Sequence, residues 1–255
     1  KGLSVFIAMS CALIFIAHPV QTQAVTYIVQ RFTSLATLFY LLSLILYIKA
    51  RLLNQVATNK GQNSGQKQRN IHIKFILCYL ASVFSTLLAM KTKEIAFTLP
   101  LIIVLYEFMF FEGNFKKRLI YLLTILFTML IIPLSFVTID TPIGEIIEAA
   151  RVQTQMSRWD YMFTEFRVIM TYIRLLVLPV NQNLDYDYPV FNSFFEPQVF
   201  LSFLFLVSIF MFGIYLYKRN RLVSFGIFWF FITLSVESSL IPIEDVIFEH
   251  RMYLP

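Results

Sequence analysis

The stretch QVFLSFLFLVSIFMFGIYLY, residues 198–217, decides the fold class of this chain. It contains no charged side chain, and an α-helix needs about 20 mostly apolar residues to cross a bilayer. Similar stretches recur along the sequence. They occupy residues 3–17, 32–50, 74–90, 95–111, 119–139 and 222–236. We therefore expect an all-α polytopic membrane protein, with residues 1–255 forming a single transmembrane domain.

The composition also indicates a membrane protein. Hydrophobic residues make up 58% of the 255 residues and charged residues 14%, and the mean hydropathy is +0.71. Because soluble domains carry about 25% charged residues, this composition excludes a water-soluble globule. The net charge of +6 is not gathered into one basic face, so we predict no nucleic-acid partner. Cys11 and Cys78 lie in apolar runs, which favours packing roles over a disulfide.

Lys and Arg in short loops indicate the cytoplasmic side of a membrane protein. Both residue types are concentrated in residues 51–73, 112–118 and 218–221, so we assign these loops to the cytoplasm. Residues 140–197 then form a long outer segment, in which we predict interfacial helices, one of them over 168–180. Thirteen of the fifteen acidic residues fall in the outer loops. Polar chemistry is therefore expected on the non-cytoplasmic side.

The first outer loop carries the sequence HPVQTQAV, residues 18–25, followed by Arg31. Thr22 is suited to cap a helix, which would present Gln23, Tyr27 and Arg31 at helical spacing on one face. Such a face suits contact with a substrate or with another polar element. A capped helix start with a snorkelling arginine explains the same residues equally well.

The turn KTKE, residues 91–94, places two cations and a carboxylate between two predicted spans. A lysine ammonium at this depth can neutralise an anion whose hydrophobic part stays in the bilayer. Lys93 is therefore a candidate for binding a lipid phosphate, with Glu94 beside it. A solvated turn that anchors two helix ends is the alternative, and the turn taken alone favours that alternative.

The segment NLDYDYP, residues 183–189, combines two carboxylates, Asp185 and Asp187, with aromatic rings. Carboxylate oxygens accept hydrogen bonds from sugar hydroxyls or hold a cation. The rings offer flat apolar faces on which a sugar could stack. A solvated acidic loop without such a role is the more frequent explanation.

The densest polar cluster follows the last predicted span. Glu237 stands at the exit of that span, and the segment EHRMYLP, residues 249–255, comes soon after it. Ionisable groups at the end of a span are costly unless they are paired or used. A structural ion-pair network is as compatible with these residues as a binding site. The sequence shows no phosphate-binding loop, dinucleotide fingerprint or zinc-ligand spacing, so we assign no metal ligands.

Together these segments resemble the membrane portion of the transmembrane-and-tetratricopeptide-repeat O-mannosyltransferase-like proteins and their bacterial relatives, which belong to the GT-C class. The family pattern His-Pro-Val-His-Thr-Glu-Ala-Val, with a later Arg, is similar to residues 18–25 and Arg31. The differences are Gln21 in place of His and Gln23 in place of Glu. The family's Ser-Lys-Glu turn resembles residues 92–94. Its Glu-Arg-x-x-Tyr-Leu-Pro-Ser segment resembles residues 249–255, with His250 at the Arg position and Arg251 after it.

The resemblance implies a GT-C-like multi-helix bundle. It would transfer a mannose-like sugar from a polyprenyl-phosphate donor to a Ser or Thr hydroxyl of a protein acceptor outside the cytoplasm. An inverting mechanism is expected, in which a carboxylate takes the hydroxyl proton while cations stabilise the departing phosphate. In the family that base is an Asp in an outer loop that comes before the span with which this chain begins. We therefore expect this chain to be a fragment that lacks the first span, that loop and the catalytic base.

The resemblance carries further expectations. A divalent metal is left open as a cofactor, and a tetratricopeptide-repeat domain is expected C-terminal to this chain in the full-length protein. The expected location is the bacterial inner membrane, or the endoplasmic reticulum membrane in a eukaryote. Lys93, Arg251 and Arg31 are the implied donor-phosphate ligands. The supporting residues are His18, Gln23, Glu94, Asp185, Asp187, Glu237, Glu249 and His250.

Two other functions are compatible with the sequence. A transporter or flippase of a lipid-linked saccharide would tend to place ionisable groups near the bilayer midplane, on broken helices in paired halves. The predicted spans are nearly free of charge and show no repeated halves. A non-catalytic membrane scaffold for a repeat domain is the other alternative. Gln23 is consistent with it, because a neutral amide cannot act as a base or bind a metal strongly.

Overall fold

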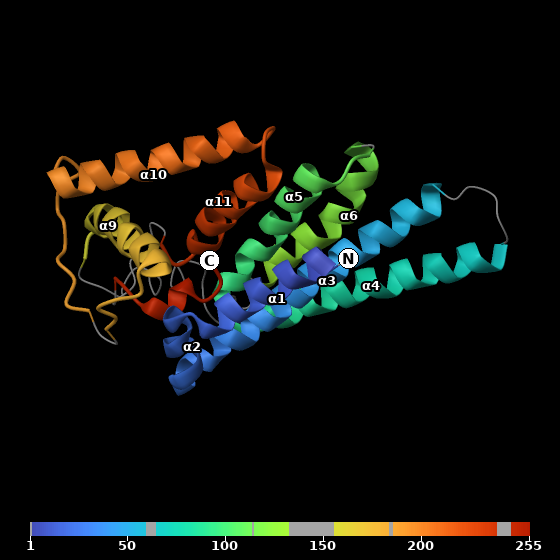
Figure 1. Cartoon of the computed structure of the whole chain (residues 1–255), viewed down its shortest axis with the longest axis horizontal. Coiled ribbons are helices and arrows are strands. Elements are labelled where there is room, and N and C mark those ends of the chain that lie inside the picture. Colours follow the sequence, from blue (N-terminus) through green and yellow to red (C-terminus); the bar gives the residue numbers. More distant parts are fainter. Residues whose placement is uncertain (1, 60–64, 114, 133–155, 184–185, 239–245) are drawn as a thin grey trace, which may run out of the picture. The chain divides into compact units, whose positions relative to one another are not determined.

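The computed structural model of the chain describes residues 2–59, 65–113, 115–132, 156–183, 186–238 and 246–255 (Figure 1). All regular structure within these ranges is helical, which confirms the predicted all-α class. The α-helices are α1 (Gly2–Ala17), α2 (Thr22–Thr26), α3 (Arg31–Asn59), α4 (Gly65–Thr92), α5 (Leu99–Phe110), α6 (Phe115–Phe127), α9 (Arg158–Val177), α10 (Pro197–Leu216) and α11 (Arg221–Leu234). Short 3-10 turns are η1 (Pro19–Gln21), η2 (Ile28–Gln30), η3 (Glu94–Thr98), η4 (Thr128–Leu130) and η5 (Glu249–Met252).

Three helical segments among the described residues are long and apolar enough to cross a membrane. They are Ile28–Ala57, Gln68–Thr92 and Pro197–Leu216. Helix α1 and the following Pro19–Thr26 pass the same test as a pair, bent by 56°. These helices indicate a membrane protein, as the composition predicts.

Other predicted spans are shorter as helices than as apolar runs. Residues 94–98 form the turn η3, so α5 has only 12 residues, and α11 has 14. At 1.5 Å per residue these helices are roughly 18 and 21 Å long, against a hydrocarbon core of about 30 Å. Helix α6 ends at Phe127 and is followed by η4. The last part of the predicted span 119–139 lies outside the described residues.

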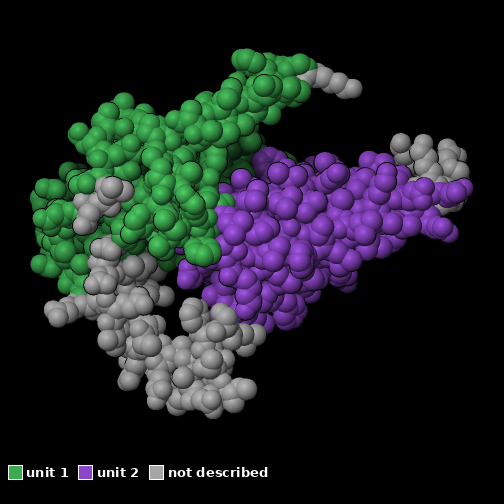
Figure 2. All heavy atoms as spheres, turned by 90° about the horizontal axis from the view of Figure 1, so that it is seen from below, with its two compact units in different colours: residues 1–34, 141–255 green, residues 35–140 purple. Residues whose placement is uncertain are grey.

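The chain divides into two compact units, where the sequence predicts a single domain (Figure 2). Unit 1 combines Lys1–Ser34 with Thr141–Pro255, and unit 2 is Leu35–Asp140. Unit 1 is therefore built from two segments of sequence, with unit 2 inserted between them.

In unit 2, small polar side chains let α3 and α4 approach closely. The Ser43 hydroxyl lies 3.2 Å from the Ser82 hydroxyl and 2.8 Å from the Thr86 hydroxyl, and all three residues are buried. The Ser82 hydroxyl also donates to the Ser43 carbonyl at 2.9 Å. Small residues and cross-helix hydroxyl hydrogen bonds are typical of helix pairs packed within a membrane.

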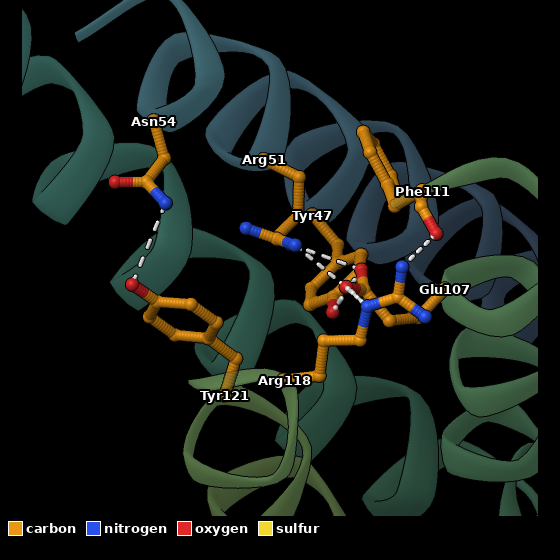
Figure 3. A network of polar contacts seen from close by, with 7 residues as sticks. All are labelled: Tyr47, Arg51, Asn54, Glu107, Phe111, Arg118 and Tyr121. Carbon is orange, nitrogen blue, oxygen red and sulfur yellow. Dashed lines mark hydrogen bonds and ion pairs between the residues drawn. The ribbon is translucent and has the colours of Figure 1, made fainter. Parts of the chain in front are cut away.

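A buried carboxylate joins three helices of unit 2 (Figure 3). Glu107 of α5 accepts two hydrogen bonds from the Arg51 guanidinium of α3, at 2.6 and 2.9 Å, and one from the Tyr47 hydroxyl at 2.9 Å. The Arg118 Nε of α6 lies 3.7 Å from the same carboxylate. Arg118 also donates to the Phe111 carbonyl. Because Glu107 is fully buried, its partners replace the water that a carboxylate would otherwise need.

Unit 1 has its core between α9 and the segment 246–252. Ser157 caps α9 by accepting from the Trp159 N–H at 3.3 Å. The helix thus begins ten residues before the interfacial stretch that the sequence predicts. Its buried residues recur at helical spacing, which gives one face to the core and one to the surroundings. They are Tyr161, Thr164, Glu165, Val168, Tyr172 and Leu175.

Helices α10 and α11 form a hairpin with a close contact at Gly213. The Ser224 hydroxyl donates to the Gly213 carbonyl at 2.8 Å, and Asn220 caps α11 by accepting from the Val223 N–H at 3.2 Å. A Cβ atom at position 213 would lie 2.9 Å from Cγ2 of Ile227. The absence of a side chain at Gly213 therefore sets the spacing of the hairpin.

We predict that Gly213→Val destabilises this hairpin. Forcing extra atoms into a packed contact typically costs about 1–3 kcal/mol, and a β-branched residue gains little helix propensity in return. Thermal unfolding of the purified chain in detergent should show a lower Tm. Gly226→Val is the matched control, because a Cβ at Gly226 meets no atom within 4 Å. Equal Tm values for the two variants would show that the contact at Gly213 is not tight.

Candidate functional site

Two segments that are far apart in the sequence meet in unit 1. The turn η1 and the helix α2, from the predicted first outer loop, pack on η5. The His250 N–H donates to Oε1 of Gln23 at 2.6 Å across 227 residues of sequence, and both residues are buried. We use the name outer cluster for five buried polar residues: Gln23 and His250, which form this contact, together with Glu249, Arg251 and Glu165.

His18 fixes the start of η1. Its Nδ1 accepts from the Val20 N–H at 3.3 Å, and its Nε2 lies 3.2 Å from the Leu176 carbonyl at the end of α9. Because the carbonyl can only accept, the proton of a neutral His18 belongs on Nε2. His18 therefore links the first outer loop to α9.

The Glu249 carboxylate accepts three hydrogen bonds from the loop that follows α9. The donors are the Gln182 side-chain amide at 2.9 Å, the Asn183 N–H at 2.9 Å and the Tyr186 hydroxyl at 2.5 Å. Burial, together with the hydrogen bond to Glu249, raises the pKa of Tyr186 to about 12. Tyr186 is thus a donor at physiological pH, and Glu249 holds Gln182, Asn183 and Tyr186 together.

Arg251 and Glu165 form a buried pair of opposite charges. Nη1 of Arg251 lies 3.7 Å from the Glu165 carboxylate, and both side chains are almost fully buried. The same Nη1 donates to the Val246 carbonyl at 2.9 Å. Burial raises the pKa of Glu165 to about 7, although the Arg251 charge opposes this shift. A carboxyl of this kind exchanges its proton near neutral pH, which is a property of acid–base groups.

Tyr172 closes the cluster from α9. Its hydroxyl donates to the Phe248 carbonyl and accepts from the Phe248 N–H, both at 3.1 Å. Tyr161 lies eleven residues, or about three turns, earlier on the same face of α9. Its hydroxyl donates to the Glu237 carbonyl at 3.0 Å. Burial raises the pKa of both tyrosines. Neither tyrosine therefore ionises in the physiological range.

The first outer loop does not form the single helix that the sequence predicts. Helix α2 ends at Thr26, Tyr27 is extended, and α3 begins at Arg31 after η2. Gln23 is consequently buried, whereas Tyr27 and Arg31 are exposed. The predicted common face of these three residues is wrong. Nε of Arg31 donates to the Val25 carbonyl at 3.3 Å, which holds the side chain across the bend.

The remaining predicted residues are not members of the outer cluster. Lys93 and Glu94 belong to unit 2, where Lys93 precedes η3 and Glu94 is exposed. Asp187 is exposed, and Asp185 lies outside the described residues. Glu237 is half-buried after α11. Within the described ranges, no three His, Cys, Asp or Glu side chains are grouped to hold a metal ion.

Sequence reasoning missed Glu165, Tyr172 and Gln182. The sequence predicts only interfacial helices in the segment 140–197, and Glu165 is one of several acidic residues in that segment. The spacing of Tyr161, Glu165 and Tyr172 along one helix face is the signal that could have identified them.

Comparisons with known proteins found no match for the chain among family models, curated proteins or solved structures. The GT-C resemblance therefore remains a resemblance in sequence motifs. The chemistry of the chain has to be argued from the outer cluster and from the motifs that form it.

Proposed function

We propose that this chain is the membrane part of a glycosyltransferase that moves a sugar from a polyprenyl-phosphate donor to a protein hydroxyl on the non-cytoplasmic side. One observation carries the proposal: residues 18–25 and 249–255, the two segments with the longest motif resemblance, contact each other through Gln23 and His250. Segments that contribute residues to one site are expected to lie close together in the fold. The apolar helices indicate that the chain lies in a membrane, which is where a polyprenyl-phosphate donor resides.

The geometry refines the roles that the resemblance implies. Arg251 is only 4% exposed and already lies beside Glu165, so we assign it to positioning η5 rather than to direct contact with phosphate. Arg31 is exposed and is the better phosphate ligand at this end of unit 1. Lys93 keeps its proposed phosphate role. His18 and Glu249 hold the loops on which these groups depend.

A second candidate is the non-catalytic scaffold, and the burial of the outer cluster favours it. Gln23, Glu249, His250 and Arg251 are each at most 7% exposed. Their hydrogen bonds hold chain segments together, as structural polar networks do. In this case the outer cluster would stabilise unit 1 without touching a substrate.

A transfer assay distinguishes these candidates. Full-length protein in liposomes would receive radiolabelled polyprenyl-phosphate sugar and a Ser/Thr peptide. We expect wild type to transfer the label, and Arg31→Ala and Lys93→Ala to lower the rate by about 100-fold, the usual cost of losing one electrostatic stabiliser of a developing charge. Arg31→Lys should recover part of the rate, because the positive charge remains.

The matched controls are Arg158→Ala and Lys91→Ala, which remove exposed cations from the same unit and the same turn. Both should transfer normally, and all variants should insert into the membrane equally. Absence of transfer from every donor, with the full-length protein folded, would reject the glycosyltransferase and leave the scaffold. Movement of labelled lipid between leaflets without transfer would instead identify a flippase.

A further inference from the structure

Unit 1 contains an open apolar groove between α9, α10 and α11. Its volume is about 410 Å³, within the roughly 300–1,000 Å³ of pockets that hold small ligands. Its lining is almost entirely hydrocarbon, and it includes Ile173, Leu176, Ile209, Val223, Gly226 and Phe230.

The groove is open because one lining position has no side chain. Gly226 is exposed, and a Cβ atom placed on it would meet no other atom within 4 Å. This is the opposite of Gly213, where a Cβ would strike Ile227. Gly226 therefore leaves space that the helices themselves do not fill.

The groove is lined mainly by α11, and its lining comes within two residues of a cluster of positive charge. Helix α10, which precedes α11 (Figure 1), is one of the helices able to cross a bilayer. The turn after it carries Lys218, Arg219 and Arg221, all exposed. Val223, at one end of the lining, is two residues from Arg221, or about 3 Å along the helix. No acidic residue occurs between residues 197 and 236.

We propose that this groove binds one acyl chain of an anionic phospholipid, whose phosphate contacts the basic turn 218–221. The apolar lining matches the chain and the three cations match the headgroup. Basic clusters beside membrane helices on the cytoplasmic side attract anionic lipids, since that leaflet is negatively charged. The site is independent of the proposed transferase chemistry, whose donor phosphate would lie on the other side of the membrane.

The test uses photoreactive lipids with a diazirine in the acyl chain and an alkyne for detection. The full chain would be placed in nanodiscs with phosphatidylglycerol, phosphatidylcholine or polyprenyl-phosphate probes of this type. We expect the phosphatidylglycerol probe to label peptides from α9 to α11 preferentially. Gly226→Leu, which fills the groove, should reduce this labelling by at least about tenfold, since burying each methylene contributes about 0.8 kcal/mol.

Two further variants keep the proposal falsifiable. Gly2→Leu adds the same side chain where a Cβ also meets nothing, and it should leave labelling unchanged. The triple variant Lys218→Gln, Arg219→Gln, Arg221→Gln should lower phosphatidylglycerol labelling to the level of phosphatidylcholine. Labelling that survives Gly226→Leu would overturn the groove as the site. Equal labelling by the neutral lipid or by polyprenyl phosphate in wild type would overturn the anionic phospholipid as its occupant.

Discussion

Glu107→Gln is expected to unfold much of unit 2 under conditions in which the wild type is stable. The substitution keeps the size of the side chain but removes the charge that Arg51 and Arg118 face. Both arginines would then lack a carboxylate in a buried setting, with side-chain exposures of only 6% and 12%. Breaking a buried ion pair by removing one partner costs about 3–5 kcal/mol.

The measurement is the Tm of the purified chain in detergent, followed by light scattering or circular dichroism. Tryptophan fluorescence is unsuitable, because Trp159 and Trp229 both lie in unit 1. Glu112→Gln is the matched control, because Glu112 is exposed five residues further along. A compensating variant, Arg51→Met with Glu107→Met and Arg118→Met, should recover much of the loss, since replacing a whole buried ionic group by apolar residues is often neutral. Equal effects of the substitutions at 107 and 112 would mean that the ion pair contributes no stability.

Arg251→Met is expected to destabilise unit 1 by about 3–5 kcal/mol at pH 8, because it leaves the Glu165 carboxylate buried without its cation. Much of this loss should be recovered at pH 5, where Glu165 is protonated and no longer needs a counter-charge. Arg158→Met, at an exposed arginine on the same helix as Glu165, should have little effect at either pH.

The wild type should show a related dependence on pH. The pKa of Glu165 is about 7 in the folded chain against an ordinary value of 4.5, so the folded state binds the proton more tightly than the unfolded state. The stability from this group is therefore complete below pH 4.5 and is lost as the pH rises to 7, by roughly 3 kcal/mol. Glu165→Gln, which resembles the protonated acid, should flatten this profile. A profile that rises with pH in this window would contradict the assignment.

The apolar runs predicted the long helices well. The run 198–217 corresponds to α10 at Pro197–Leu216, because a long uncharged stretch has few ways to satisfy its backbone in a membrane other than as a helix. The bend at Tyr27 could not be predicted in the same way. No glycine or proline occurs between residues 20 and 31, and the break accompanies the packing of α2 on η5, a contact with residues more than 200 positions away.

The partners of charged residues also depend on contacts between distant parts of the sequence. Glu107 is an acidic residue within the apolar run 95–111, yet nothing local indicates that Arg51, 56 residues earlier, would pair with it. The loop charges predict one membrane side for residues 18–25 and 249–255, and in unit 1 these two segments contact each other. The burial of Glu165 was not predicted, because it depends on how α9 packs against residues 246–252.

The hydrogen bond between Gln23 and His250 has a consequence for synthesis of the chain. Residues separated by 227 positions emerge from the ribosome roughly 10–45 seconds apart at about 5–20 residues per second. During that interval the first outer loop has no partner, while residues 35–140, contiguous in the sequence, can already assemble. The nascent protein must therefore keep its first loop available until residues 249–252 have been synthesised, which makes that loop the natural point of action for a chaperone or an insertion factor.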